Sequence, residues 1–433
     1  MPSLYPPMFR VRQTFEGPTV DDIPGTVEAE LKRLDLGRTI KAGQSVAVTA
    51  GSRGIANIHT IVKAIVQHLQ RLGAKSFVVP AMGSHGGGTV EGQRGILAGY
   101  GITEEFLGCP IRATMETVVV CQTPEGFPVH FDRFAYEADH VIVCGRIKPH
   151  TNFVGDIESG LMKMMLIGLG KHNGAKIYHR AIQNYSFGQI VRRVANTVIE
   201  KCRVAAGVGI VENGYDQTAK IAAVGPQEIE AREKELLVQA KKWLPRLPFE
   251  TVDVLIVEEI GKNISGAGMD TNVIGRKGLQ LPPGEHEVPL VRRIIVRGLT
   301  EVTHGNACGF GIAEFALSRA VRQMDREITA INCLTGGHPE GARIPIHYET
   351  DREALDGALC TIGLTEPPDA RIVWIQNTLD LVEVECSAAY LNEARTRSDL
   401  EILTEPRALP LDASGMLPPL ASLSSGRRQA VHA

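Results

Sequence analysis

Short runs of β-branched and small apolar residues recur along the first half of the chain. Each run is followed by a loop of small residues and then by a segment in which apolar residues have helical spacing. The clearest runs are SVAVTA at 45–50, SFVVPA at 76–81 and DHVIVC at 139–144. Strands that are apolar throughout and are joined through helices are typical of parallel sheets covered on both faces. The pattern therefore predicts an α/β fold, with candidate functional loops at the carboxyl ends of the strands.

The chain has 433 residues, more than one hydrophobic core usually accommodates, so two domains are expected. A proline-flanked stretch at 244–248 marks the predicted boundary. We predict an N-terminal α/β domain over 1–248 and a C-terminal α/β domain over 249–405, whose largely parallel sheets flank an interdomain cleft. Within the second domain, 310–324 has the spacing of one helix. The Pro-, Ser- and Ala-rich residues 406–433 are expected to form a disordered tail.

Charge and composition exclude several classes of partner. The 46 basic and 49 acidic residues give a formal net charge of -3, and no polybasic block occurs. Neither nucleic acid nor a membrane surface is therefore expected as a partner. The chain has no signal-peptide pattern and no apolar run long enough to cross a bilayer, and its eight cysteines form no C-x-x-C pair. These features favour a cytoplasmic protein with reduced, buried thiols and a small-molecule partner, and they leave a homo-oligomer open.

The passage from Cys144 to Arg180 concentrates the candidate functional residues. His150 closely follows a predicted strand, which is where open α/β sheets bind their ligands. Ser159 is the predicted N-cap of a helix that begins at Gly160. Lys163 would then lie in the first helical turn, beside amide groups that are free to hold an anion.

Lys163 and His179 are sixteen residues apart, so one unbroken helix would place them on nearly opposite faces. Breaks predicted at 168–170 and at 173–174 would let the chain fold back and bring both side chains to one pocket. Lys163 has apolar neighbours on both sides, which favours a half-buried or reactive lysine over a solvated one. His172, in contrast, has the sequence context of an exposed turn residue.

Two earlier strand-end loops add further candidates. Ser52 and Arg53 follow the first strand, and the Arg53 guanidinium suits either a bidentate contact with a carboxylate or a helix cap. His85 follows the second strand and precedes a run of small residues: Gly86, Gly87, Gly88 and Thr89. Such a run can cradle a phosphate, but this one matches neither the P-loop nor the dinucleotide fingerprint. For a lone histidine in such a loop, functional and ordinary packing roles carry equal weight.

This ordered set of an arginine loop, two strand-end histidines, a lysine and a last histidine resembles the nickel-dependent lactate racemase family. The resemblance implies two α/β domains around a nickel-pincer nucleotide, a pyridinium mononucleotide whose thioacyl arms chelate nickel. It implies that Lys163 is the covalent tether, that His179 ligates nickel, and that His85 and His150 are paired acid/base residues. The residues that would surround the cofactor are Ser52, Gly86, Gly87, Gly88, Thr89, Ser159 and Gly160.

The resemblance also assigns the substrate carboxylate to Arg53. In the second domain, the family's substrate contacts have no clear match, and four residues are stand-ins: Lys262, Asp270, Asn272 and Arg276. Asn152, Asp156 and Glu158 lie in the loop between His150 and Lys163, and the loop 261–272 adds Lys262, Asn263, Ser265 and Asp270. Their polarity would suit a substrate larger than lactate, such as a longer 2-hydroxy acid or a sugar acid. Exposure of these loop residues to solvent carries equal weight. Enzymes that make the cofactor are further implied partners.

The expected activity is an isomerase reaction, the racemisation or epimerisation of a 2-hydroxy acid. The α-hydrogen of such an acid is barely acidic, so its removal as hydride is favoured when a histidine takes the hydroxyl proton at the same time. Two alternatives stay open. One is a zinc-dependent hydrolase or lyase whose ligands are His85, His150 and His179. The other is a non-catalytic nucleotide or cofactor carrier of the same fold.

Overall fold

The structure, a computed structural model, describes residues 5–52, 54–277 and 288–423. It divides into two compact units, one of Glu16–Leu244 and the other of Met1–Phe15 with Pro245–Ala433. The division falls in the proline-flanked stretch expected as the boundary. The first fifteen residues, however, belong with the C-terminal part of the chain and not with the N-terminal domain.

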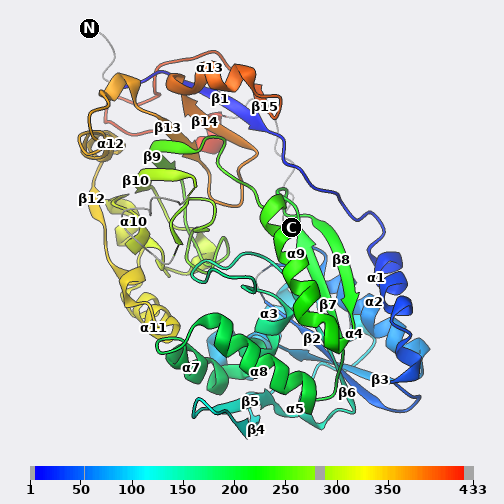
Figure 1. Ribbon diagram of the computed structural model, residues 1–433. Coiled ribbons are helices and arrows are strands. Elements are labelled where there is room, and N and C mark those ends of the chain that lie inside the picture. Colours follow the sequence, from blue (N-terminus) through cyan, green and yellow to red (C-terminus); the bar gives the residue numbers. More distant parts are fainter. Residues whose placement is uncertain (1–4, 53, 278–287, 424–433) are drawn as a thin grey trace. The chain divides into compact units, whose positions relative to one another are not determined.

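The unit Glu16–Leu244 is built on a five-stranded sheet in the order β3-β2-β6-β7-β8 (Figure 1). The first four strands run parallel, and β8 is antiparallel to β7. The bounds of the strands are β2 (Ser45–Ala50), β3 (Lys75–Pro80), β6 (His140–Arg146), β7 (Val204–Glu212) and β8 (Thr218–Val224). The three apolar runs singled out in the sequence are therefore neighbours at the centre and one edge of this sheet.

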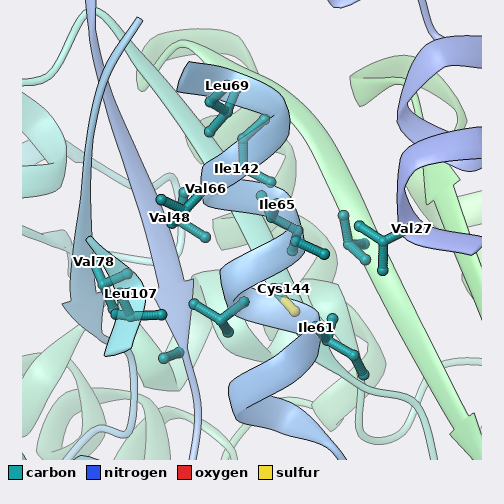
Figure 2. Packing of buried hydrophobic residues seen from close by; sticks show 14 of the residues in the cluster. Val27, Val48, Ile61, Ile65, Val66, Leu69, Val78, Leu107, Ile142 and Cys144 are labelled. Carbon is teal, nitrogen blue, oxygen red and sulfur yellow. The ribbon is translucent and has the colours of Figure 1, made fainter. Parts of the chain in front are cut away.

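Helices cover both faces of this sheet because alternate apolar residues of each strand point to opposite sides. On one face, α1 (Ile23–Arg33) and α2 (Ile58–Arg71) pack against Val48, Val78 and Ile142, as Figure 2 shows. On the other face, the strand residues pack against α7 (Lys171–Ala181) and α8 (Phe187–Lys201), while α9 (Ile229–Trp243) packs against β7 and β8. Shorter helices are α3 (Val90–Gly99), α4 (Glu104–Leu107) and α5 (Arg133–Glu137).

A separate antiparallel hairpin is formed by β4 (Thr117–Gln122) and β5 (Pro128–Asp132). Its turn closes through a hydrogen bond from the Gly126 amide to the Thr123 carbonyl, 3.0 Å long. The alternating pattern of residues 113–135 is typical of such a hairpin. The hairpin ends in Asp132, whose side chain has a role near the candidate site.

The second unit contains an eight-stranded sheet in the order β12-β11-β10-β9-β13-β14-β1-β15 (Figure 1). From β12 to β13 all neighbours are parallel, whereas the pairs β13-β14, β14-β1 and β1-β15 are antiparallel. The strands are β1 (Met8–Gln13), β9 (Thr251–Val257), β10 (Leu290–Val296), β11 (Phe315–Leu317), β12 (Ile346–Tyr348), β13 (Ile372–Ile375), β14 (Glu383–Ser387) and β15 (Leu400–Ile402). The helices are α10 (Ser318–Arg322), α11 (Arg326–Gly336), α12 (Asp351–Leu359) and α13 (Leu391–Thr396). The predicted class, α/β with largely parallel sheets, is confirmed.

Two expectations for this unit are wrong. Residues 310–324 do not form one helix, because β11 lies inside the segment and pairs with both β10 and β12. A short, fully buried strand has the same apolar content as a buried helical turn, so periodicity did not separate them. The segment from 406 to 423 is also not a free tail. The Arg407 backbone pairs with that of Met8 at 2.7 and 2.8 Å, and Leu417 and Leu420 are buried in the core.

Throughout the described parts of the chain, no helix combines the length and the apolar character that crossing a membrane requires.

Candidate functional site

Three strand ends of the unit Glu16–Leu244 meet one helical segment. This segment consists of α6 (Leu161–Lys163) and a π-helical turn, η3 (Met164–Gly168). A Cβ atom on Gly51, directly after β2, would lie 3.2 Å from Cε of Met164, and one on Gly145, near the end of β6, would lie 2.8 Å from its Cγ. Both strand ends therefore lie so close to Met164, the residue after Lys163, that a Cβ atom at either glycine would crowd its side chain.

The end of β3 makes the same approach one turn later. A Cβ on Gly83 would lie 3.0 Å from Cγ2 of Ile167, and the Gly83 amide donates to the Gly168 carbonyl at 3.2 Å. Gly83 has a φ of +59°, which a glycine adopts without strain. The loops that carry Ser52, His85 and His150 thus converge on the helical segment of Lys163, at the edge where the sequence predicted a site.

Ser52 and His85 are joined directly. The Ser52 Oγ and His85 Nδ1 atoms are 2.5 Å apart. The two residues follow neighbouring parallel strands, β2 and β3, which explains their proximity. Such a bond holds the imidazole in one orientation, as an acid/base histidine requires.

The small residues after His85 have backbone roles. Gly86, Gly87 and Gly88 all have φ between +64° and +67°, which glycine tolerates and other residues rarely adopt. A Cβ on Gly86 would lie 2.5 Å from the carbonyl carbon of Gly92, so the loop packs directly on the first turn of α3. Thr89 is the N-cap of α3, and its Oγ1 accepts from the Gly92 amide at 3.0 Å.

A buried ion pair supports this loop, and the sequence reading missed it. Lys171 Nζ lies 3.0 Å from Oδ2 of Asp132, and both side chains have 0% exposure. Lys171 also donates to the carbonyl of Pro80, at the end of β3, at 2.5 Å, and to Oε1 of Gln93 at 3.3 Å. The Gln93 amide in turn donates to the Gly83 carbonyl at 2.9 Å. Lys171 therefore anchors the loop that leads to His85.

The His150 ring is oriented by its own loop. Its Nδ1 atom accepts from the amides of Asn152 at 3.0 Å and Phe153 at 3.3 Å, and its ring stacks on that of Phe153 with centroids 4.5 Å apart. Because Nδ1 accepts these hydrogen bonds, the neutral imidazole carries its proton on Nε2. The backbone amide of His150 donates to Oε2 of Glu158 at 2.7 Å, and Lys241 pairs with the same carboxylate at 2.6 Å.

The helix end next to Lys163 differs from the prediction. Its N-cap is Gly160, whereas Ser159 is bonded through its backbone to Lys148 at 2.9 and 3.3 Å. The group at this helix end is the carboxyl of Glu233, which accepts from the Met162 amide at 2.9 Å. A Cβ on Gly160 would lie 2.4 Å from Oε1 of Glu233, so the glycine makes room for this buried carboxyl. Burial raises the pKa of Glu233 to about 7.

Lys163 and His179 are both half-buried and lie on different helices. The predicted break at 168–170 is confirmed, because η3 ends there and α7 begins at Lys171, whose φ is +55°. The predicted break at 173–174 is wrong, because these residues lie inside α7. A Cβ on Gly174 would lie 2.8 Å from Cε2 of Tyr178, so this glycine serves ring packing and not a turn.

His172 is not an exposed turn residue, contrary to the prediction. It lies in the first turn of α7, and a Cβ on Gly88 would lie 3.5 Å from its Nδ1. Within the described residues this Nδ1 is buried and has no hydrogen-bond partner. Burial and the nearby charge of Lys176 lower the pKa of His172. A polar atom of this kind beside a glycine loop is a candidate contact for a bound nucleotide.

Most of the second-domain candidates have partners in their own unit. Asp270 accepts from the backbone and the side-chain amide of Asn272 at 2.9 and 2.7 Å. Lys262 donates to the Gly266 carbonyl. Arg276 is fully buried and binds the Ile312 carbonyl at 2.7 Å and Glu314 at 2.9 Å, so it is a core residue and not a substrate contact.

Arg53, the predicted carboxylate-binding residue, lies outside the described residues. In the loop after His150, Asp156 pairs with Arg192 at 2.7 Å and with Lys234 at 3.1 Å. Glu158, as described above, is also engaged within the fold. Asp156 and Glu158 are therefore committed to intramolecular contacts, whereas Asn152 Oδ1 is buried without a hydrogen-bond partner among the described residues.

The comparisons with known proteins agree with this geometry. Residues 23–188 match the model of the family described as the lactate racemase N-terminal domain. The matched range contains the loops of Ser52, His85 and His150 together with Lys163 and His179.

Among solved structures, the chain is similar to the lactate racemase apoprotein from Thermoanaerobacterium thermosaccharolyticum, with a TM-score of 0.52 and 13% identity over 86% of this chain and 95% of that one. A protein from Thermotoga maritima is matched with a TM-score of 0.47 and 15% identity over 65% of this chain and 72% of that one. The first likeness supports the fold. A comparison with the curated proteins gives no match. Over residues 23–188 the chain is therefore similar to the lactate racemase N-terminal domain, and its fold resembles that of a lactate racemase.

Proposed function

We propose that the protein is a racemase or epimerase of a 2-hydroxy acid and that it uses a nickel-pincer nucleotide tethered to Lys163. The observation that carries the proposal is the position of Lys163. It lies half-buried directly after Leu161 and Met162, which have no exposure, at the edge of the sheet where the loops of Ser52, His85 and His150 converge. This arrangement falls inside the matched lactate racemase N-terminal domain.

The residues present fit such a cofactor. Lys163 would form the thioamide, His179 would ligate nickel through its imidazole, and the glycine loop with the orphaned Nδ1 of His172 would accept the nucleotide. When bound, the cofactor would supply an electrophilic pyridinium carbon as hydride acceptor. The backbone of Ser159 pairs with that of Lys148, and the Thr89 hydroxyl caps α3. The proposed contact of Thr89 with the cofactor would therefore come from a hydroxyl that already caps a helix.

The protein groups would handle the proton. His85, held by Ser52, and His150, held through Nδ1 by two backbone amides, would each take or return the hydroxyl proton for one enantiomer. His150 would do so through Nε2. Arg53 is proposed to retain the substrate through its carboxylate, and Lys262, Asp270 and Asn272 remain the proposed second-domain contacts. Because Asp156 and Glu158 form ion pairs within the fold, these two residues do not support a larger substrate, and the proposed substrate class is the 2-hydroxy acids in general.

The zinc alternative has less support. Three zinc ligands must have donor atoms within a few ångströms of one another. In the described parts of the chain, His85, His150 and His179 do not form such a group. The carrier alternative has no observation in its favour, because a carrier would not need two separately oriented histidines.

Peptide mapping tests the tether. The chain is produced together with cofactor-making enzymes, digested and analysed by mass spectrometry. The adduct is expected on the peptide that contains Lys163, and Lys163→Ala should lose both adduct and activity. Lys176→Ala is the matched control, because Lys176 is exposed on the adjacent helix α7. An adduct on Lys171 or Lys176 would contradict the proposed role of Lys163.

Isotope labelling tests the reaction class. If the α-hydrogen moves as hydride, turnover in D₂O should leave the α-position of the product unlabelled, and α-deuterated substrate should keep its label. Rapid uptake of solvent deuterium at that carbon would indicate a carbanion route instead. Replacing His85 or His150 should abolish turnover without loss of the Lys163 adduct, whereas a carrier would tolerate both changes.

A further inference from the structure

We propose that Cys308, Cys333 and His338 in the second unit form a binding site for one zinc ion. One ligand atom from each residue lies within 4.8 Å of the others. Both cysteine side chains are buried, and the histidine is half-buried. In the described residues this is the only such group of three histidine, cysteine or acidic side chains.

The fold holds these three residues in place. Cys333 lies in the last turn of α11, which ends at Gly337 with φ +74°. The His338 amide donates to the Cys333 carbonyl at 3.0 Å, so the helix cap fixes the spacing of these two ligands. A Cβ on Gly336 would lie 2.4 Å from His338 Nε2, so the imidazole folds back over the end of its own helix.

The loop of Cys308 is tied to the same helix. The Ala307 amide donates to Oγ1 of Thr329, a residue of α11, at 3.0 Å, and the Cys308 amide donates to Oδ1 of Asn306 at 3.1 Å. Cys308 therefore faces α11 from a loop with its own hydrogen bonds. A site of this kind is organised before a metal binds, which favours specific binding over adventitious contact.

One polar atom of the cluster has no partner among the residues that the structure describes. In the described residues, His338 Nδ1 is buried without a hydrogen bond. A buried nitrogen of this kind costs free energy unless a ligand or water satisfies it.

The donor set favours zinc. Two thiolates and one imidazole match the catalytic class of zinc sites, which keep a fourth position for water or another ligand. Magnesium and calcium prefer oxygen ligands and are excluded by this chemistry. Two thiolates neutralise the charge of a divalent ion and leave the fourth position open to water. The proposal does not rest on the proposed function, since the proposed nickel ligand His179 belongs to the other unit.

Zinc binding is measured on reduced, metal-free full-length chain produced without cofactor-making enzymes, by competition with a chromophoric chelator. One zinc ion per chain is expected. Cys308→Ser and His338→Gln should each weaken zinc binding by more than about tenfold. Cys360→Ser is the control, because this exposed cysteine lies at the end of α12 and outside the cluster. His338→Gln also covers the case in which a buried cysteine variant fails to fold.

Cobalt substitution adds a spectroscopic readout. The wild-type chain with Co²⁺ should show a thiolate-to-cobalt charge-transfer band that Cys308→Ser weakens and Cys360→Ser leaves unchanged. The proposal is overturned if the wild-type chain takes up no stoichiometric zinc, or if Cys308→Ser and His338→Gln bind zinc as the wild type does. A native disulfide between Cys308 and Cys333, found by peptide mapping of the protein as isolated, would also overturn it.

Discussion

The ion pair between Lys171 and Asp132 offers the strongest test of how the site is supported. Lys171→Met removes the charge, keeps most of the side-chain volume, and leaves the Asp132 carboxylate buried without its cation. It also removes the donor to the carbonyl of Pro80. Burial lowers the pKa of Lys171 and raises that of Asp132, so the fold already bears a desolvation cost for both groups. Their mutual attraction and their hydrogen bonds to Pro80, Gln93 and Ala135 offset this cost.

The expected size follows from this arrangement. Removing one partner of a buried pair leaves an uncompensated charge and destabilises proteins by about 3 to 5 kcal/mol. Adding Asp132→Asn should restore part of this loss, because the remaining group is neutral and still caps α5 through Oδ1, which accepts from the Ala135 amide at 2.9 Å. The double variant should therefore be more stable than Lys171→Met alone. Lys176→Met, on the exposed face of α7, should change stability by less than about 0.5 kcal/mol.

Urea unfolding followed by tryptophan fluorescence measures these differences. The chain has two tryptophans, Trp243 in the unit Glu16–Leu244 and Trp374 in the other unit. In a Trp374→Phe background the emission therefore reports on the unit that contains the ion pair. Hydrogen exchange of the peptide that spans 81–93 should also become faster in Lys171→Met, because Gln93 loses its partner beside the His85 loop. A loss below about 1 kcal/mol, or additive effects in the double variant, would refute the reasoning.

Two further predictions concern the neighbours of Lys163 and His85. The folded pKa of Glu233 is raised by burial from 4.5 to about 7, so the contribution of this group to the stability of its unit should be fully present below pH 4.5 and should fall by up to about 3 kcal/mol as the pH rises to 7. Glu233→Gln should remove this dependence, and equal urea midpoints for wild type at pH 5 and pH 8 would contradict it. Ser52→Ala removes the hydrogen bond that orients His85 and should lower the turnover of cofactor-loaded protein by about 10²-fold or more, with the Lys163 adduct intact. Unchanged turnover would mean that the serine has no part in positioning the histidine.

The strands of the first unit were predictable because their signal is local. The run 45–50 coincides with β2, and the runs at 76–81 and 139–144 overlap β3 and β6 within two residues. A buried parallel strand is apolar at every position, and a glycine or a small residue follows it, so few neighbours decide the outcome. In contrast, β11 is only three residues long, and its strand character comes from pairing with β10 and β12.

The sequence indicated which loops form the candidate site but not which distant side chains contact and support them. Strand-end placement indicated the loops of Ser52, His85 and His150, because topology alone brings such loops together. It could not indicate Glu233, which is 71 residues from Met162 in sequence and caps its helix. Asp132 and Lys171 were equally hidden, because nothing in the sequence around either residue shows that both side chains are buried. Contacts between distant segments decide which charged residues are structural.

The cluster of Cys308, Cys333 and His338 was likewise not predictable from the sequence. A sequence search for zinc sites depends on short ligand spacings such as C-x-x-C, and this chain has none. Here Cys333 and His338 are separated by four residues, and the turn that brings them together is a helix C-cap at Gly337. This cap reverses the direction of the chain and so brings Cys333 close to His338, as a short ligand spacing does in zinc motifs. The pattern to look for in related chains is therefore a cysteine in the last turn of a helix, followed by glycines and then by a histidine. A loop that is distant in sequence would contribute the third ligand.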